Sequence, residues 1–122
     1  MWLVVAGGGA LGCLSRYGLT EWFYHVDGKT FPWGILTANV LGSLLIGMVA
    51  VVLLAKNPSE LWRGAIIIGF LGGFTTFSSF SLDTVRMLQE GLYGRALTYI
   101  LASVVLCLLA TAIGWWLGSF CK

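Results

Sequence analysis

Between Gly69 and Asp83, a stretch hydrophobic enough to cross a membrane is interrupted by residues that suit a lipid-facing helix badly. A spanning helix is mostly Leu, Ile, Val and Ala, because hydrocarbon offers no hydrogen-bond partners to an interrupted backbone. From Gly72 to Leu82 the chain instead carries two glycines, two threonines, three serines and three phenylalanines. Broken helices at membrane depth are tolerated only inside protein or beside a water-filled path. We therefore expect this helix to break near Gly72–Thr76 and to line such a path.

A plainer interpretation of the same stretch stays open. Serine and threonine hydroxyls in spanning helices often donate to the carbonyl one turn earlier, and phenylalanines three residues apart often only pack. The density of hydroxyls favours the first interpretation, because five of them fall between Thr75 and Ser81.

The composition indicates that the whole chain is a membrane protein. Of its 122 residues, 58% are hydrophobic and 10% are charged, against about 25% charged residues in soluble domains. Stretches that reach the length of about 20 apolar residues needed by a spanning helix are Trp2–Leu19, Phe31–Ala55, Gly64–Leu88 and Arg95–Phe120. The connections are short, so the sequence predicts one all-α, multi-pass domain of four transmembrane helices over residues 1–122, with both termini on one side.

The charges and polar side chains exclude several classes of function. A net charge of +2 gives no electrostatic footprint for nucleic acid. No nucleophile–base pair, cluster of metal-ligating side chains or phosphate-binding loop is visible, so we do not expect an enzyme. The three cysteines (Cys13, Cys107 and Cys121) have no disulfide or metal spacing. No acidic residue or histidine lies in the middle of a predicted span, which removes the usual proton relay.

Lysine and arginine are distributed evenly between the two sides of the predicted bundle. One side carries Lys56, Arg63 and Lys122, and the other carries Lys29, Arg86 and Arg95, with Arg16 near the end of the first segment. Membrane orientation follows the side that has more of these residues. A chain with three against three is expected to insert both ways, which permits an antiparallel homodimer of dual topology. Moving the predicted boundaries by one or two residues would weaken that expectation.

Pairs of glycines four residues apart occur in the first and fourth segments, as Gly8 with Gly12 and Gly114 with Gly118. Such spacing lets helix backbones approach closely, although it is common in membrane helices. The pattern predicts that these two segments pack tightly against their neighbours.

Two stripes of polar or small residues follow single helix faces. Every fourth position holds Asn39, Ser43 and Gly47 in the second segment, and Tyr99, Ser103, Cys107 and Thr111 in the fourth. At 3.6 residues per turn each set shares one face. Asn39 is costly in hydrocarbon unless paired, so it either clamps two helices or lines a path. The stripe of the fourth segment is either a seam between helices or a track of hydrogen-bond donors.

The groups in the predicted spans that could bind a ligand are hydrogen-bond donors and the edges of aromatic rings. The donors, which are candidate anion contacts, are Asn39, the hydroxyls of the third segment, among them Ser78 and Ser81, and Tyr99, Ser103 and Thr111. Phe77 and Phe80 share one helix face, and an aromatic ring is positive at its edge. Donors and ring edges stabilise an anion without a fixed charge that would trap it, as conduction requires. Arg16 either draws anions into a vestibule or snorkels to the interface.

The run Gly72-Gly73-Phe74-Thr75-Thr76-Phe77-Ser78-Ser79-Phe80-Ser81 resembles the signature of the CrcB/Fluc family of fluoride channels. Supporting matches are Gly8–Gly12 followed by Arg16-Tyr17, then Asn39–Ser43, then Glu90–Ala96. Together they touch every predicted segment in the order that the family has. The motif in the third segment is specific, whereas the others would be weak alone.

The resemblance implies a passive channel that exports fluoride across a bacterial inner membrane, built as an antiparallel, dual-topology homodimer with two pores. It implies that the pore is formed by Phe77, Phe80, Asn39, Tyr99, Ser103 and Thr111, with Arg16 toward a vestibule. It also implies a structural Na⁺ at the dimer centre, held by the backbone carbonyls of Gly72 and Thr75. Where the family tends to offer a hydroxyl, this chain has Cys107, and a thiol is a weaker donor.

Two other functions remain open at this point. A small multidrug or proton-coupled exporter would also be a four-helix protein of dual topology. That class needs a membrane-embedded glutamate in its first helix, and the first segment has none. A structural subunit of a larger complex would leave the density of hydroxyls unexplained.

Overall fold

The computed structural model describes residues 1–27, 31–56 and 59–120, and all the regular elements in these ranges are helices. The long helices are α1 (Trp2–Asp27), α2 (Trp33–Lys56) and α6 (Tyr93–Ser119). The remaining span consists of consecutive pieces, α3 (Glu60–Arg63), the π-helix η1 (Gly64–Leu71), α4 (Gly72–Phe74) and α5 (Ser78–Gln89). Lys29, Cys121 and Lys122, which entered the sequence argument, lie outside the described residues.

Three of the four expected spans are found, with shifted ends. Among the described residues, three helices are long and apolar enough to cross a membrane: Trp33–Leu53, Glu60–Gln89 and Tyr93–Ser119. The first expected span, α1, is helical but is not among these three. Its glycines and Arg16 lower its mean hydropathy. Its predicted end at Leu19 is wrong. The helix continues to Asp27, since no glycine or proline interrupts the chain between Gly18 and Gly28.

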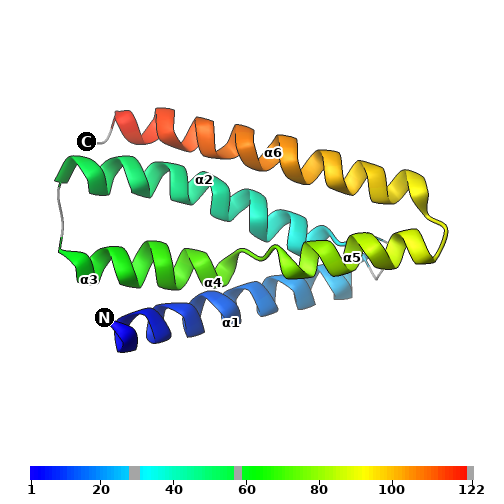
Figure 1. Cartoon of the computed structure of the whole chain (residues 1–122), viewed down its shortest axis with the longest axis horizontal. Helices are drawn as coiled ribbons and strands as arrows, with labels where there is room; N and C mark the ends of the chain where they lie inside the picture. The colour runs from blue at the N-terminus through cyan, green and yellow to red at the C-terminus, as the bar shows by residue number, and fades with distance from the viewer. Residues whose placement is uncertain (28–30, 57–58, 121–122) are drawn as a thin grey trace.

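The bundle consists of two pairs of parallel helices (Figure 1). The first helix, α1, packs against η1 and α4, which extend in the same direction, and α2 packs most extensively against α6. The two pairs are antiparallel to each other. Both chain ends lie at the same end of the bundle, as an even number of crossings requires.

Glycines set how closely the helices of each pair approach, as their spacing predicted. A Cβ atom added at Gly12 would collide with the backbone carbonyl of Phe70 in η1, and one added at Gly114 would collide with the carbonyl of Leu44 in α2. Gly8 and Gly118, one turn away, meet the carbonyls of Ala65 and Met48 in the same way. The expected close approach is therefore confirmed for both pairs.

The expected break in the third span is confirmed, and it begins later than the glycines suggested. Gly72 and Gly73 are helical, whereas Thr75 is extended, with φ −92° and ψ 156°. The glycine at 73 serves close packing instead, because a Cβ there would meet the carbonyl of Gly9 at 2.6 Å. The chain returns to helix at Ser78, so the break covers residues 75–77.

Gly91 makes the tight connection between α5 and α6. It has a φ of 78°, a left-handed conformation that glycine adopts readily. The Leu92 N–H donates to the Met87 carbonyl at 2.8 Å, which closes the end of α5 in a Schellman-type cap. Within the Glu90–Ala96 motif, Gly91 is thus explained by the left-handed turn that joins the two helices.

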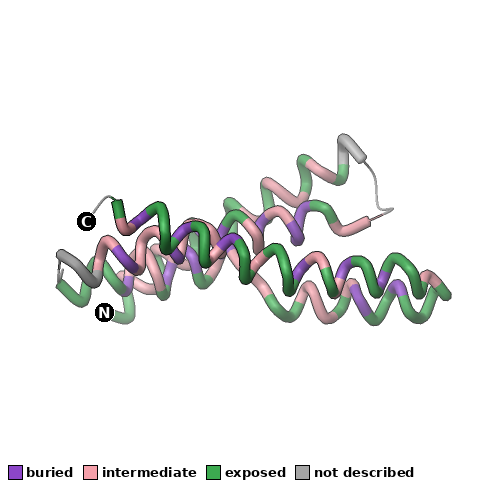
Figure 2. The backbone as a smooth tube through the Cα atoms, turned by 90° about the horizontal axis from the view of Figure 1, so that it is seen from above, coloured by how far each residue is buried: buried purple, intermediate pink, exposed green. Residues whose placement is uncertain are grey.

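Buried and exposed residues alternate along the helices (Figure 2), and many of the exposed residues are large and apolar. The buried cluster consists of Leu36, Met87, Ala96 and Tyr99. Exposed leucines such as Leu101 and Leu109 lie on α6 outside the cavity lining, as a lipid-facing helix requires. At one end the bundle separates into two arms, the α5–α6 hairpin and the end of α1 with the start of α2.

Candidate functional site

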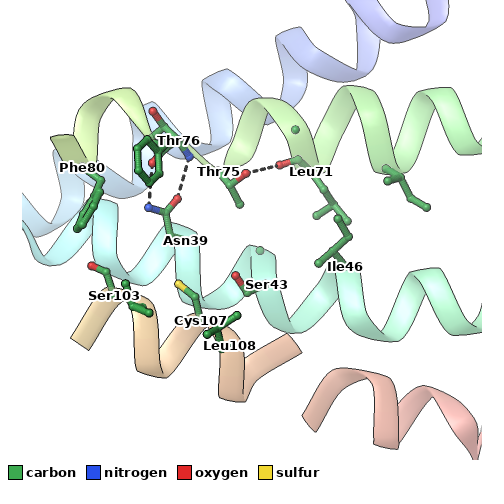
Figure 3. Close-up of a pocket in the computed structure, with 15 residues that line it drawn as sticks. Asn39, Ser43, Ile46, Leu71, Thr75, Thr76, Phe80, Ser103, Cys107 and Leu108 are labelled. Atoms are coloured by element: carbon green, nitrogen blue, oxygen red, sulfur yellow. Dashed lines mark hydrogen bonds between the residues drawn. The ribbon is translucent and has the colours of Figure 1, made fainter. Parts of the chain in front are cut away.

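A cavity of about 630 Å³ lies beside the helix break, between α2, the third span and α6 (Figure 3). Most of its wall is apolar, and its polar groups are uncharged. The lining residues with a polar side chain are Asn39, Ser43, Thr75, Thr76, Ser103 and Cys107. A mostly apolar cavity with a few convergent polar groups is typical of a small-ligand site.

Asn39 joins α2 to the break with two hydrogen bonds. Its Oδ1 accepts from the Thr76 N–H at 2.8 Å, and its Nδ2 donates to the Thr76 carbonyl at 3.0 Å. One amide side chain thus satisfies both backbone groups of a residue that has left the helix. Asn39 also lines the cavity, so the two roles left open by the sequence, clamp and lining, coexist in the structure.

The break also deprives several carbonyls of their helical donors, among them those of Gly72 and Thr75. In a continuous helix the Gly72 carbonyl would accept from the Thr76 N–H, and the Thr75 carbonyl from the Ser79 N–H. The Thr76 N–H donates to Asn39, and the Ser79 N–H donates to the Thr76 hydroxyl at 3.2 Å. The carbonyls of Gly72 and Thr75 have therefore lost these two helical donors.

Carbonyl oxygens of this kind suit a hard cation such as Na⁺. In the parts of the chain that the structure describes, no group of three or more His, Cys, Asp or Glu residues lies together to hold a metal. A cation bound at the break would accordingly depend on backbone oxygens, and the residues present fit such a site.

The aromatic rings of the third span are in contact with each other and with α6. The ring centroids of Phe77 and Phe80 are 5.5 Å apart, and those of Phe80 and Tyr99 are 5.1 Å apart. Phe77 and Phe80 both line the cavity. Phe77 is 78% exposed in the single chain, so one side of this aromatic wall lacks cover from the chain itself.

The polar stripe on α6 has two roles: one part contacts α2, and the other part lines the cavity. The Thr111 hydroxyl donates to the Ser43 carbonyl at 3.0 Å, which fixes α6 to α2. Ser103 and Cys107 line the cavity instead. The hydroxyls of Ser103 and Tyr99 are buried and have no hydrogen-bond partner among the described residues. The seam is confirmed at Thr111, and the donor track stays a prediction for Ser103 and Cys107.

Several predicted residues lie outside the cavity lining. Tyr99 is buried, and Thr111 and Ser81 are half-buried, but none of the three lines the cavity. Ser78 is exposed, with its hydroxyl 3.2 Å from that of Thr76. The Thr75 hydroxyl donates back to Leu71, as the plainer interpretation of the third span predicted.

Arg16 is half-buried in α1, apart from the main cavity. Its Nε has no hydrogen-bond partner within the described chain.

A second cavity, of about 420 Å³, lies between the two arms of the bundle and was not expected from the sequence. Its charged lining residues are Glu21, Asp83, Arg86, Glu90 and Arg95. The spacing of Asp83 and Arg86 on one face of α5, followed by Glu90 at its C-cap, is the signal that could have found it. Tyr99, fully buried, contacts Phe80 of the first cavity and, at 5.5 Å between ring centroids, Phe31 of the second. This aromatic contact lies between the two cavities.

Comparison with known proteins adds an independent finding to this geometry. A family described as "CrcB-like protein, Camphor Resistance (CrcB)" matches residues 3–115, nearly the whole chain. This chain belongs to the CrcB family. The match covers the glycine seam of α1, the broken third span and the α6 stripe, so the CrcB pattern includes every element of the site.

CrcB relatives similar to this chain carry a functional name. A protein of Geobacter metallireducens named "Fluoride-specific ion channel FluC" is 49% identical over 112 residues, which are 90% of this chain and 86% of the relative. Proteins with the same name are 45% identical in Geobacter sulfurreducens, over 92% of this chain and 91% of the relative, and 46% identical in Agrobacterium fabrum, over 94% and 93%.

The Asn39 clamp can be tested by removing its hydrogen bonds while keeping its size. Asn39→Leu leaves the N–H and carbonyl of Thr76 without partners, and each unpaired buried group costs about 1–3 kcal/mol. We expect a lower thermal unfolding midpoint in detergent and faster hydrogen exchange at the Thr76 amide. Ser15→Ala is the matched control, because that hydroxyl donates only to Leu11 on an exposed face of α1. Equal exchange at Thr76 in both variants would contradict the clamp.

Proposed function

We propose that this chain is a fluoride-selective channel that lets F⁻ leave a bacterial cell passively across the cytoplasmic membrane. The observation that carries the proposal is the cavity beside the helix break, which is lined by the rings of Phe77 and Phe80 and by uncharged polar side chains, with no charged side chain in its lining. Membership of the CrcB family, and the names of the relatives, agree with it.

Several weak interactions in the cavity can replace the hydrogen bonds that an anion loses when it leaves water. Ser103 lines the cavity and its hydroxyl has no hydrogen-bond partner among the described residues, and Asn39 keeps a second N–H on Nδ2 after bonding to Thr76. The positive edges of Phe77 and Phe80 add a weaker attraction. Fluoride is small and strongly hydrated, so only a close series of donors offsets its dehydration. None of these groups carries a full charge, so the ion is not held too tightly to move on.

Passive flow is sufficient for the task. Fluoride enters from acidic surroundings as the neutral weak acid, dissociates inside, and can leave as the anion down its gradient and the membrane potential. The spans have no central carboxylate or histidine that would relay protons. Arg16 is proposed to raise the local anion concentration near one end of the path.

The functional unit is proposed to be an antiparallel homodimer of dual topology. The even distribution of Lys and Arg supports it. So does the exposure of Phe77 on the open side of the cavity, where a second copy would supply the missing wall. The two copies together would enclose two pores.

A structural Na⁺ is proposed at the centre of that dimer. The Gly72 and Thr75 carbonyls, whose helical donors are diverted, would hold it together with the same carbonyls of the second copy. The ion would neutralise the partial negative charge that four freed carbonyls bring together.

Fluoride flux from liposomes tests the proposed function directly. With protein in liposomes loaded with fluoride, a potassium ionophore to set the voltage and no pH gradient, we expect fluoride efflux that follows the voltage. Chloride should stay inside. The fluoride and chloride traces come from matched liposomes, and protein-free liposomes give the leak. Efflux that required an opposing proton gradient would replace the channel with an antiporter.

The ring edges are tested by Phe77→Ile and Phe80→Ile, which keep bulk but remove the aromatic quadrupole. We expect each variant to lose fluoride flux by roughly tenfold or more, as for the loss of one contact worth 1.4 kcal/mol. Phe70→Ile is the matched control, because the Phe70 ring stacks on Phe74 away from the cavity lining. If both cavity variants conduct like the control, the phenylalanines only pack.

Dual topology predicts that the C-terminus is found on both sides of the membrane. In intact cells, a single introduced cysteine after Lys122, with Cys13, Cys107 and Cys121 replaced by serine, should be labelled by an impermeant reagent in about half of the copies. Lysed cells give the full signal as the control. Labelling of all copies, or of none, would exclude the antiparallel dimer.

The sodium proposal predicts stabilisation by Na⁺ in protein purified without it. A ligand that binds only the folded state at 100 times its Kd adds about 2.7 kcal/mol. We expect a higher thermal midpoint in NaCl than in N-methylglucamine chloride at equal ionic strength, with a smaller rise in KCl. Identical thermal midpoints in all three salts would contradict the proposed sodium site.

A further inference from the structure

Cys107 lies on the cavity side of α6, one helical turn after Ser103. Both residues line the main cavity, and Figure 3 shows the Cys107 sulfur on the same side of α6 as the Ser103 hydroxyl, below Asn39. Thr111, one turn further along, has its hydroxyl engaged with the Ser43 carbonyl. Within the α6 stripe, Ser103 and Cys107 are therefore the members that face the cavity.

Ser103 supplies an independent sign that a ligand reaches this place. The residue is only 7% exposed, and its Oγ is buried without a hydrogen-bond partner. A buried hydroxyl without a partner is costly, so a group that enters the cavity and accepts a hydrogen bond from it is favoured. A ligand held by Ser103 would lie one turn of helix from the Cys107 sulfur.

We propose that Cys107 is a modification site within the anion path, at which small, neutral, soft electrophiles close the channel. This inference rests on the proposed function. With an organomercury chloride, the S–H bond breaks and an S–Hg bond forms. The Hg–Cl bond breaks, chloride leaves with its electron pair, and the thiol proton passes to water, so no oxidant or reductant is needed.

The cavity favours reagents of this class over charged ones. Its lining is apolar apart from uncharged donors, so a cationic reagent would lose its hydration without a counter-charge. A neutral mercurial also crosses lipid, and thiol sulfur is the soft ligand in the cavity wall. Modification replaces an S–H donor by an apolar group that occupies the path beside Ser103.

Fluoride efflux from liposomes, with peptide mass spectrometry on the same samples, tests the proposal. Phenylmercury chloride should give an adduct on Cys107 and lower fluoride efflux by roughly tenfold or more, the loss expected when a hydrogen bond to a charged group is removed. The smaller methylmercury chloride should inhibit less, and dithiothreitol should restore the flux. Efflux through Cys107→Ser, compared with the untreated rate of the same variant, should resist both reagents, and its peptide should carry no adduct. Cys13→Ala, whose residue lies on α1 outside both cavities, should stay sensitive.

Each other outcome overturns a defined part of the argument. No adduct on Cys107 means that the thiol is not reached, and an adduct with unchanged efflux means that it lies off the path. Inhibition that persists in Cys107→Ser assigns the effect to another residue. If the unmodified protein carries no fluoride, the proposed function fails, while the adduct on Cys107 still reports whether the cavity admits the reagent.

Discussion

The two hydrogen bonds between the Asn39 side chain and the Thr76 backbone are the interaction on which the rest of the site depends. Without them, a backbone that leaves the helix in the middle of a membrane would have unpaired polar groups. With them, α2 holds the break in place. The break in turn gives Phe77 its exposed position at the cavity and releases the carbonyls of Gly72 and Thr75. The stability of the bundle and the shape of the candidate path therefore have the same origin.

The sequence predicted the features that have a local pattern. Apolar length gave the spans, glycine spacing gave the close pairs of helices, and the density of hydroxyls located the broken segment. The polar stripe on α6 was predicted, but not which of its residues contact α2 and which line the cavity. A periodic pattern reports which residues share a face, and only packing decides that Thr111 bonds to α2 while Ser103 faces a cavity.

What could not be predicted depends on contacts between distant residues. Asn39 and Thr76 are separated by 37 positions, so nothing near Thr75 signals that the break begins there and not at the glycines. The second cavity is formed by α1, α2 and the α5–α6 hairpin together, and underestimating the length of α1 hid one of its walls. The π-helical geometry of η1 has no marker in its apolar sequence.

The broken span also has an electrical consequence. Each helix carries a partial positive charge at its N-terminus and a partial negative charge at its C-terminus. At the break, the end of α4 at Phe74 and the start of α5 at Ser78 are close in sequence, so both partial charges lie near each other without an ionised side chain between them. The start of α5, beside Phe77, suits an anion, and the end of α4, with its freed carbonyls, suits a cation. One interrupted helix thereby provides neighbouring environments for ions of opposite sign, separated by only a few residues of backbone.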